Sequence, residues 1–381
     1  MSTAGSNRPG IGTGRRALVV GGTGPSGPDV VHGLLHRGFD TTIFHGGTHE
    51  VPLPDEVRHI HGDPHFPETI AEALGDADFD VVIAQYGRLR HLAAHLSGRA
   101  GHIVAIGGAM SPLASPADPR WGPVGRPAIV REEERHLLTN AGENKLGFRI
   151  AQAATEFLEA GASGAFTATY IAYPTLYGPR QPGSPEWSIV RRLRDQRPRI
   201  VIPDGGLRIE SRAYVGNVAQ APLAAVDDPT AAAGRSYVVA DRDVYTVRQR
   251  IEFIARYMGV DVELVDMPYR LATPAHPLYR GGLSHRATGS DAIRRELGYS
   301  DAFDTAAALA QTVDWLLGAS EAAIAEIETQ LGDCFDYAFE DALIGWWQEM
   351  TAAPPQMADR EYTYSHIYRH PSKPGETWRR G

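Results

Sequence analysis

The chain of 381 residues has little cysteine, no long apolar run and no excess of positive charge. Its single cysteine, Cys334, excludes an intrachain disulfide framework and a cysteine-rich metal site, and it fits a reducing cytosol. No apolar run approaches the roughly 18 residues needed to span a bilayer. The formal net charge of -9 argues against a nucleic-acid-binding surface, because phosphate contacts need clustered Lys and Arg. We therefore expect a soluble cytoplasmic protein without membrane or nucleic-acid partners.

The chain does contain short β-branched runs that alternate with helical patterns, which is typical of a parallel sheet covered by helices. A crossover helix is expected at 28–38, and a later helix contains "NKLGFRIAQAATEF" (144–157). The expected strands lie at 17–22, 40–47, 57–63, 79–87, 101–108, 166–181, 235–241 and 260–268. The predicted fold class is α/β: a Rossmann-type doubly wound parallel sheet, a smaller C-terminal α/β substrate domain, and an extra helical and irregular tail.

The same patterns divide the chain into four segments. The polar, Gly-rich start lacks an apolar segment, so residues 1–14 are expected to be a disordered leader rather than a signal peptide. Residues 15–180 are the predicted dinucleotide-binding domain, and 181–318 the substrate domain, with parts of 207–245 returning to the sheet. Residues 319–381 form the extension. Its large apolar area would be costly to expose, so it should pack on the main body or on a second subunit, as in a homodimer.

The strongest motif is "VVGGTGPSGPDVV", a glycine turn between the first strand and the first helix. This spacing permits a tight turn, close approach of a pyrophosphate to backbone N–H groups, and close packing of helix on strand. The helix then presents its positive end to the phosphates. The residues expected to contact a dinucleotide here are Gly21, Thr23, Gly24, Pro25, Ser26 and Gly27.

The residues after the second strand bear on which dinucleotide binds. An acidic residue there would bond the ribose 2′-hydroxyl of NAD, whereas an Arg would favour the 2′-phosphate of NADP. This chain has His45, Gly46, Gly47, Thr48 and His49, which include neither type. We lean slightly to NADP, because the two histidines and the threonine can donate hydrogen bonds to a phosphate. A polar loop that contacts no ligand is an equal alternative.

Five further motifs accompany the glycine turn. They are "HGD" (61–63), "YPTLYGPRQ" (173–181), "IPDGG" (202–206), "SRAYVGNVAQAPLAAV" (211–226) and "ATGSDAIRRELGY" (287–299). With them the chain resembles an extended short-chain dehydrogenase/reductase of the NAD-dependent epimerase/dehydratase family, over residues 15 to 318. Together these motifs are specific for the fold and much less specific for the reaction.

The resemblance implies roles for eight residues. Asp63 would bond the adenine amino group, and Arg212 occupies a position that grips a substrate phosphate in sugar-nucleotide members. Two short runs would border the rest of the cofactor, Ala84, Gln85 and Tyr86 at the ribose and Tyr173, Pro174 and Thr175 at the nicotinamide.

The family's chemistry uses a Tyr, a Lys four residues later on the same helix face, and a Ser or Thr after the fifth strand. Aligning "FRIAQAATE" through Glu156 places Phe148 at the Tyr position, facing the substrate, and Gln152 at the Lys position, facing the cofactor. Ala109 stands where the hydroxyl residue belongs and would border the substrate, with Ser111 two residues later. The resemblance therefore extends to the cofactor but not to the proton relay.

A count of lysines supports this alignment. The whole chain holds only Lys145 and Lys373, and the residues four positions before them are Ala141 and Arg369, so no Tyr-x-x-x-Lys exists. General acid–base catalysis contributes about 10²- to 10⁴-fold. Phe has no proton to give, and Gln carries no charge that would lower a neighbour's pKa. Alkoxide chemistry at neutral pH would need another acid.

Four residues are candidate replacements. Lys145 shares a helix face with the two replaced positions if the helix has already begun there; otherwise it is solvated, which we favour. Tyr86, with Arg88 beside it as a substrate contact, lies at the carboxyl edge of the sheet, and packing under the next helix is its alternative. Tyr173 either faces the nicotinamide or is structural. Ser111 offers the nearest hydroxyl after the fifth strand.

Two other features are weaker. The run "HIHGDPH" (59–65) has histidine spacings that suggest a metal, but it is expected to be a strand end at the adenine site, so we predict no metal. Trp187 is expected near the domain cleft, where a substrate wall and plain packing are equal alternatives.

Three functions fit these observations. The first is an NAD(P)-dependent oxidoreductase, epimerase or dehydratase that acts on a small hydroxylated or carbonyl metabolite without the usual acid–base pair. The second is a non-redox cyclase, isomerase or lyase that retains the cofactor, and the third is a non-catalytic dinucleotide-binding regulator. The intact glycine turn and Asp63 favour the two enzymes.

Overall fold

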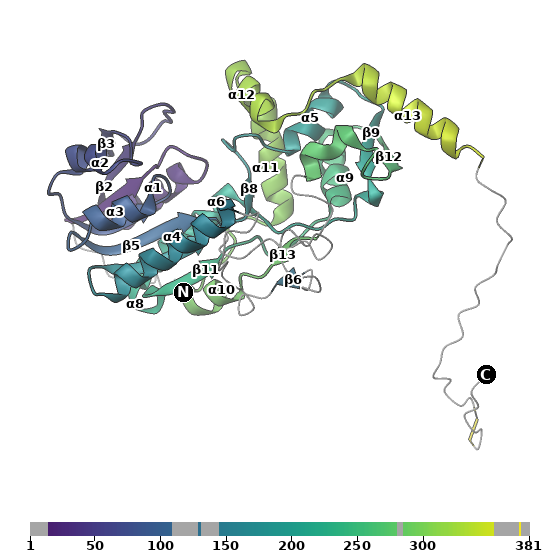
Figure 1. Cartoon of the computed structure of the whole chain (residues 1–381). Helices are drawn as coiled ribbons and strands as arrows, with labels where there is room; N and C mark the ends of the chain where they lie inside the picture. Colours follow the sequence, from purple (N-terminus) through teal and green to yellow (C-terminus); the bar gives the residue numbers. More distant parts are fainter. Residues whose placement is uncertain (1–13, 109–128, 131–144, 280–284, 354–372, 375–381) are drawn as a thin grey trace, which may run out of the picture. The chain divides into compact units, whose positions relative to one another are not determined.

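The computed structural model describes residues 14–108, 129–130, 145–279, 285–353 and 373–374. The chain forms two compact units, Met1–Phe335 and Asp336–Gly381, and Figure 1 shows the elements of each. Of the predicted leader (1–14), the structure describes only Gly14. After residue 353 it describes only residues 373–374. None of the described helices is both long and apolar enough to cross a bilayer.

A seven-stranded parallel sheet forms the centre of the first unit, in the order β11-β7-β5-β4-β1-β2-β3. Its strands are β1 (Arg15–Val20), β2 (Phe39–His45), β3 (Arg58–His61), β4 (Phe79–Ala84), β5 (Ala100–Gly107), β7 (Thr167–Ala172) and β11 (Arg235–Val238). The strand order reverses between β1 and β4, and ligands of such sheets bind in the crevice outside the carboxyl ends at this point. The predicted doubly wound fold is confirmed.

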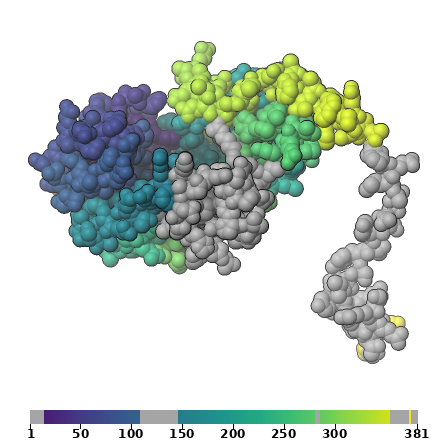
Figure 2. All heavy atoms as spheres, in the orientation of Figure 1, coloured from purple at the N-terminus to yellow at the C-terminus, as the bar shows by residue number. Residues whose placement is uncertain are grey.

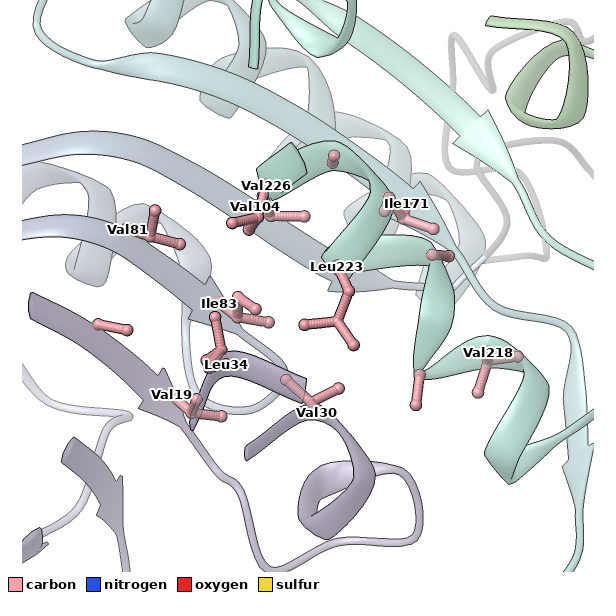
Figure 3. Close-up of a cluster of buried hydrophobic side chains, with 14 of the residues drawn as sticks. Val19, Val30, Leu34, Val81, Ile83, Val104, Ile171, Val218, Leu223 and Val226 are labelled. Atoms are coloured by element: carbon pink, nitrogen blue, oxygen red, sulfur yellow. The ribbon is translucent and has the colours of Figure 1, made fainter. Parts of the chain in front are cut away.

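Helices cover both faces of the sheet because the strands are apolar on both sides. On β1, Val19 is buried in the cluster on one face, while Leu18 and Val20 belong to the cluster on the other, as expected of a parallel sheet. The first face is covered by α1 (Gly27–His36), α7 (Gln220–Asp227), α8 (Pro229–Ala232) and α10 (Asp291–Leu297). In Figure 3, Leu34 of α1 and Leu223 of α7 meet the sheet side chains of this cluster. The second face is covered by α2 (Pro67–Leu74), α3 (Leu89–His95) and α4 (Lys145–Ala162).

A smaller core completes the first unit. It surrounds the fully buried Trp187 and includes Ile251, Val313 and Ile327. Its elements are α5 (Glu186–Arg194), β9 (Arg199–Pro203), α9 (Val247–Met258), β12 (Glu263–Met267), α11 (Thr305–Gly318) and α12 (Glu321–Leu331), with β9 parallel to β12. Two more parallel pairs are β8 (Thr175–Tyr177) with β10 (Arg212–Tyr214), and β6 (Ile129–Val130) with β13 (Ala287–Thr288).

Two boundaries differ from the sequence expectations. The strand expected at 166–181 is divided, because Pro174 follows β7 and has no N–H to donate to a ladder, so β8 pairs in a separate sheet. The extension expected from residue 319 begins with α12, whose Ile327 and Leu331 are buried in the smaller core. The second unit begins later and contains α13 (Tyr337–Thr351).

Candidate functional site

The glycines of the turn between β1 and α1 differ in whether the backbone requires them. Gly21 and Gly22 have φ of 101° and 85°, in the region that favours glycine. A Cβ on Gly27 would lie 2.3 Å from the Gly22 carbonyl oxygen, so helix and strand pack too closely for any side chain there. Gly24 differs: it is exposed, and a Cβ built on it would meet nothing within 4 Å. The turn itself therefore does not require a glycine at this position.

The turn leads directly into the N-terminus of α1. Ser26 is the N-cap residue, but its side chain forms no capping hydrogen bond. The guanidinium of Arg180 donates to the Pro25 carbonyl oxygen at 3.0 Å and lies 3.7 Å from a carboxylate oxygen of Asp29. Burial raises the pKa of Asp29, and Arg180 opposes this shift. The positive end of the helix and Arg180 together favour an anion at the turn.

Sequence reasoning missed Arg180, which belongs to the "YPTLYGPRQ" motif but had received no role. Its Nε is buried and has no hydrogen-bond partner among the described residues. Arg180 contacts a turn 155 residues earlier in the chain. The motif was visible in the sequence, but only the fold shows which turn it contacts.

The end of β4 borders the turn. The Gln85 backbone N–H donates to the Val20 carbonyl at 3.0 Å, and its side-chain Nε2 is buried without a hydrogen-bond partner among the described residues. Tyr86 is 56% exposed, and a Cβ on Gly21 would lie 3.3 Å from the Tyr86 Cβ. Buried donors are nearly always satisfied, so the Gln85 amide fits an acceptor supplied by a ligand. The buried Ala84 completes this strand end.

Asp63 follows β3 at the same edge of the sheet. Its Oδ1 accepts hydrogen bonds from the His65 backbone N–H at 2.9 Å and from the His65 ring at 2.7 Å. The backbone hydrogen bond lowers the pKa of Asp63, which keeps the carboxylate ionised and able to accept from an amino group. Arg88 is exposed nearby, with its guanidinium 5.6 Å from the centre of the Phe66 ring.

Tyr173 is committed to a structural hydrogen bond. Its phenol donates to the Val218 carbonyl at 2.9 Å. Burial raises its pKa far above the usual value, and Ser26 only partly opposes this. This placement disfavours Tyr173 as an acid or base. Pro174 is half-buried, and Thr175 is exposed at the start of β8.

The helix that should carry the proton relay is α4, and it begins at Lys145, so this residue lies on the helix rather than in the preceding loop. Phe148 is half-buried and Gln152 is exposed, four positions apart on one face. Ala109 and Ser111 lie outside the described residues. Of the tyrosines considered from the sequence, Tyr86 is exposed; its Cβ lies next to Gly21, and its ring packs edge-on against His65, with the ring centres 4.8 Å apart.

The substrate residues expected near the cleft are buried. Trp187 is fully buried in the smaller core and donates to Glu328 at 2.8 Å, which favours the packing alternative. Arg212 is 7% exposed and donates to Glu186 at 2.7 Å. Arg250 also contacts Glu186, at 3.3 Å. Glu186 thus lies between two buried guanidinium groups.

Glu210 extends this set into what we call the arginine cluster: Arg208, Arg212, Arg250, Arg286, Glu186 and Glu210. Glu210 lies 3.3 Å from Arg208, 3.5 Å from Arg212 and 3.7 Å from Arg286. Four guanidinium groups meet two carboxylates in this cluster, and the buried Asp241 also acts on Arg250.

The predicted cofactor residue His45 has unexpected neighbours. The end of β2 brings it together with His59, His61 and Glu50, although we predicted no metal from the sequence. Burial lowers the pKa of His45, so its ring is neutral at physiological pH. The N-terminal part of the chain, to which these four residues belong, is coloured purple and blue in Figure 2.

No protein-family model matches the chain, and no curated protein matches it in sequence. Solved structures do match it in fold. A crystal structure of UDP-galactose 4-epimerase aligns with 80% of this chain and 99% of its own, at 15% identity and a TM-score of 0.59. The dTDP-glucose 4,6-dehydratase from Bacillus anthracis, in complex with NAD, covers 80% and 97% at 17% identity and a TM-score of 0.60. The UDP-glucose 4-epimerase from Thermotoga maritima, with UDP-glucose, covers 80% and 99% at 16% identity and a TM-score of 0.62. At these identities the likeness shows the fold alone.

Proposed function

We propose that the chain is an NAD(P)-dependent enzyme of the oxidoreductase, epimerase or dehydratase type. The observation that carries this proposal is the open space at Gly24, together with the Gln85 side chain next to Gly21, whose buried Nε2 has no hydrogen-bond partner in the part of the chain that the structure describes. A turn that served packing alone would not need a glycine at Gly24. Both features have a physical reason if a pyrophosphate and ribose approach the backbone there.

The residues present fit a nicotinamide dinucleotide. The glycine turn and Arg180 would hold the pyrophosphate, Gln85 the ribose, and Asp63 the adenine amino group. When bound, the nicotinamide supplies hydride transfer, while the chain orients the substrate and moves its proton. The sequence leaned to NADP, but the carboxylate of Glu50 lies within 3.9 Å of the His45 ring and would repel a 2′-phosphate. We therefore propose that NAD binds at least as well as NADP.

The substrate we propose is a small hydroxylated or carbonyl metabolite that carries a phosphate. Its support is the arginine cluster, in which Arg208, Arg212 and Arg286 surround Glu210, because guanidinium groups suit the recognition of phosphate. The structural neighbours named above are enzymes of nucleotide sugars, which makes a sugar nucleotide the first class to test. In this assignment the cluster binds the anionic part of the substrate and leaves the hydroxyl or carbonyl for the nicotinamide side.

The proton would be moved by a different residue from the usual Tyr. Tyr86 is the candidate, because it is an exposed tyrosine at the carboxyl edge of the sheet, with its Cβ next to Gly21 and its ring against His65. The presence of Phe148 and Gln152 on α4 favours a second candidate function, a non-redox isomerase, cyclase or lyase that retains the dinucleotide. The cytoplasmic location and a homodimer remain predictions.

A turnover experiment separates these functions. Purified protein is mixed with NAD or NADP and with UDP-glucose, UDP-galactose or dTDP-glucose, and both the absorbance of the reduced nicotinamide and the sugar products are followed. Formation or consumption of reduced cofactor, or an epimer or dehydrated sugar formed only with the oxidised cofactor, supports the proposal. Conversion that leaves the bound cofactor unchanged and works equally well with the oxidised and reduced forms supports the non-redox alternative.

A pair of variants tests the proton role. Tyr86→Phe keeps the ring and removes the hydroxyl, and we expect it to lower turnover by about 10²- to 10⁴-fold. Tyr257→Phe removes another exposed phenol, one that is bonded to Asp314, and should leave turnover unchanged. Full activity in Tyr86→Phe would exclude Tyr86 as the acid or base.

A further inference from the structure

Three histidines share one face of the sheet at its β3 edge. In the parallel pairing of β2 and β3, which lie side by side in Figure 1, His45 is the register partner of His61. His59 stands two residues before His61 on β3 and therefore points to the same face. The loop after β2 brings Glu50 back to these rings. Strand register, rather than sequence spacing alone, places the three histidines together, and the loop adds Glu50.

The separations between the ligand atoms are short. The Nε2 of His45 lies 3.3 Å from the Nδ1 of His59, and the Nε2 of His61 lies 3.3 Å from the Oε1 of Glu50. One nitrogen or oxygen from each residue falls within 4.8 Å of the others. Around a tetrahedral zinc ion with bonds of about 2.0–2.1 Å, neighbouring ligand atoms are about 3.3–3.4 Å apart. The His45–His59 and His61–Glu50 separations, which would be two opposite edges of such a tetrahedron, therefore already have the required length.

The remaining edges can close by small side-chain movements. Glu50 and His61 are about half exposed, with side-chain exposures of 52% and 59%, so neither is locked by packing. His45 is buried, with 4% of its side chain exposed, and provides a fixed point at the end of β2. The backbone N–H of Gly47 approaches its Nδ1 only at a long 3.3 Å. One fixed ligand and two that can move suit capture of a small ion.

The donor types select the kind of ion. Imidazole nitrogen suits zinc, copper, iron and nickel, whereas calcium and magnesium prefer a set composed of oxygens. Three imidazoles and one carboxylate make a complete tetrahedral set, as in a closed zinc site without an open position for substrate.

We propose that His45, Glu50, His59 and His61 bind one divalent transition-metal ion, with zinc the best match. The ion fastens the loop between β2 and β3 to the β3 edge of the sheet. Because all four positions are filled by the protein, its role is structural. None of the four ligands belongs to the glycine turn, although His45 and Glu50 border the place proposed for the ribose of the dinucleotide.

Direct titration tests this site. The full-length protein is treated with a chelator, desalted and titrated calorimetrically with zinc chloride, and a parallel sample is titrated with cobalt(II). We expect one ion per chain, a higher melting temperature with zinc, and the intense visible absorption of tetrahedral cobalt(II). No binding of either ion, or a cobalt spectrum of octahedral type, would overturn the proposal.

Variants identify the ligands. His59→Ala and His61→Ala remove exposed side chains, and each should weaken zinc binding at least about 100-fold, since even residues that only support ligands contribute 10- to 100-fold. His49→Ala is the matched control, because His49 lies in the same loop, 69% exposed and outside the cluster. Equal affinity in all three variants would contradict the assignment. An NADH titration of the metal-free protein tests the proposed cofactor separately, so the two outcomes are distinguishable.

Discussion

Gly24→Ala separates a dinucleotide turn from a purely structural one. In the protein without ligand, the added methyl group would meet nothing within 4 Å, and Gly24 does not have a left-handed φ. Replacing a glycine by alanine in a compatible conformation stabilises a protein by about 0.4–1 kcal/mol, because the unfolded chain loses freedom. The variant should therefore fold with an unchanged or slightly higher melting temperature.

Dinucleotide binding should respond in the opposite direction. If a pyrophosphate approaches the backbone at Gly24, the methyl group occupies space that the ligand needs. We expect the Kd for NADH to rise at least about tenfold, a loss of about 1.4 kcal/mol of binding free energy. The assay is a fluorescence titration with NADH, with thermal unfolding of the same sample as the check on folding.

Two further glycines provide the controls. Gly27→Ala places a Cβ 2.3 Å from the Gly22 carbonyl oxygen, so it should destabilise the fold by about 1–3 kcal/mol. Gly318→Ala adds a methyl group in open space at the end of α11, so it should give a similar small gain in stability and leave NADH binding unchanged. The reasoning is refuted if Gly24→Ala folds normally and binds NADH as tightly as the unchanged protein.

Three other predictions concern the core and α4. Burial lowers the pKa of His102 from 6.5 to about 4, so the unfolded state binds more protons than the folded state between these pH values. The free energy of unfolding should therefore fall by up to about 3 kcal/mol as the pH drops through this range. Urea unfolding of His102→Gln at several pH values should lack this fall. Glu186→Gln removes the carboxylate that Arg212 and Arg250 share and leaves Arg212 with Glu210 alone, so it should destabilise by about 3–5 kcal/mol. Asp40→Asn, in an exposed pair, should cost less than about 1 kcal/mol by the same assay. Phe148→Tyr combined with Gln152→Lys restores the usual pair. If the pocket has been rebuilt for other chemistry, we expect less than about a tenfold gain in NADH-dependent carbonyl reduction, whereas a gain of about 10²-fold or more would show a simply disabled dehydrogenase.

The sheet was predictable because its evidence is local. Each buried strand is a short β-branched run, and the glycine turn stands between the first strand and the first helix, so strand, turn and helix can be read in order. The division after β7 was also present in the sequence as Pro174. Reading 166–181 as one return to the sheet ignored that proline's missing N–H.

The site was less predictable because its contacts join distant segments. Arg180 reaches Pro25 across 155 positions, and the sequence does not show which turn the "YGPRQ" motif contacts. Trp187 could line a cleft or fill a core, and only the packing of α5 and α12 decides between them. The histidine cluster needed the register of β2 with β3, which pairs His45 with His61.

The most direct measurement is a crystal structure of the protein grown with NAD. Our account predicts the pyrophosphate against the backbone N–H groups of residues 21–27 at the start of α1, and the Gln85 amide bonded to the ligand. A folded protein whose glycine turn stays empty at saturating NAD and NADP, or is filled by its own side chains, would contradict the account.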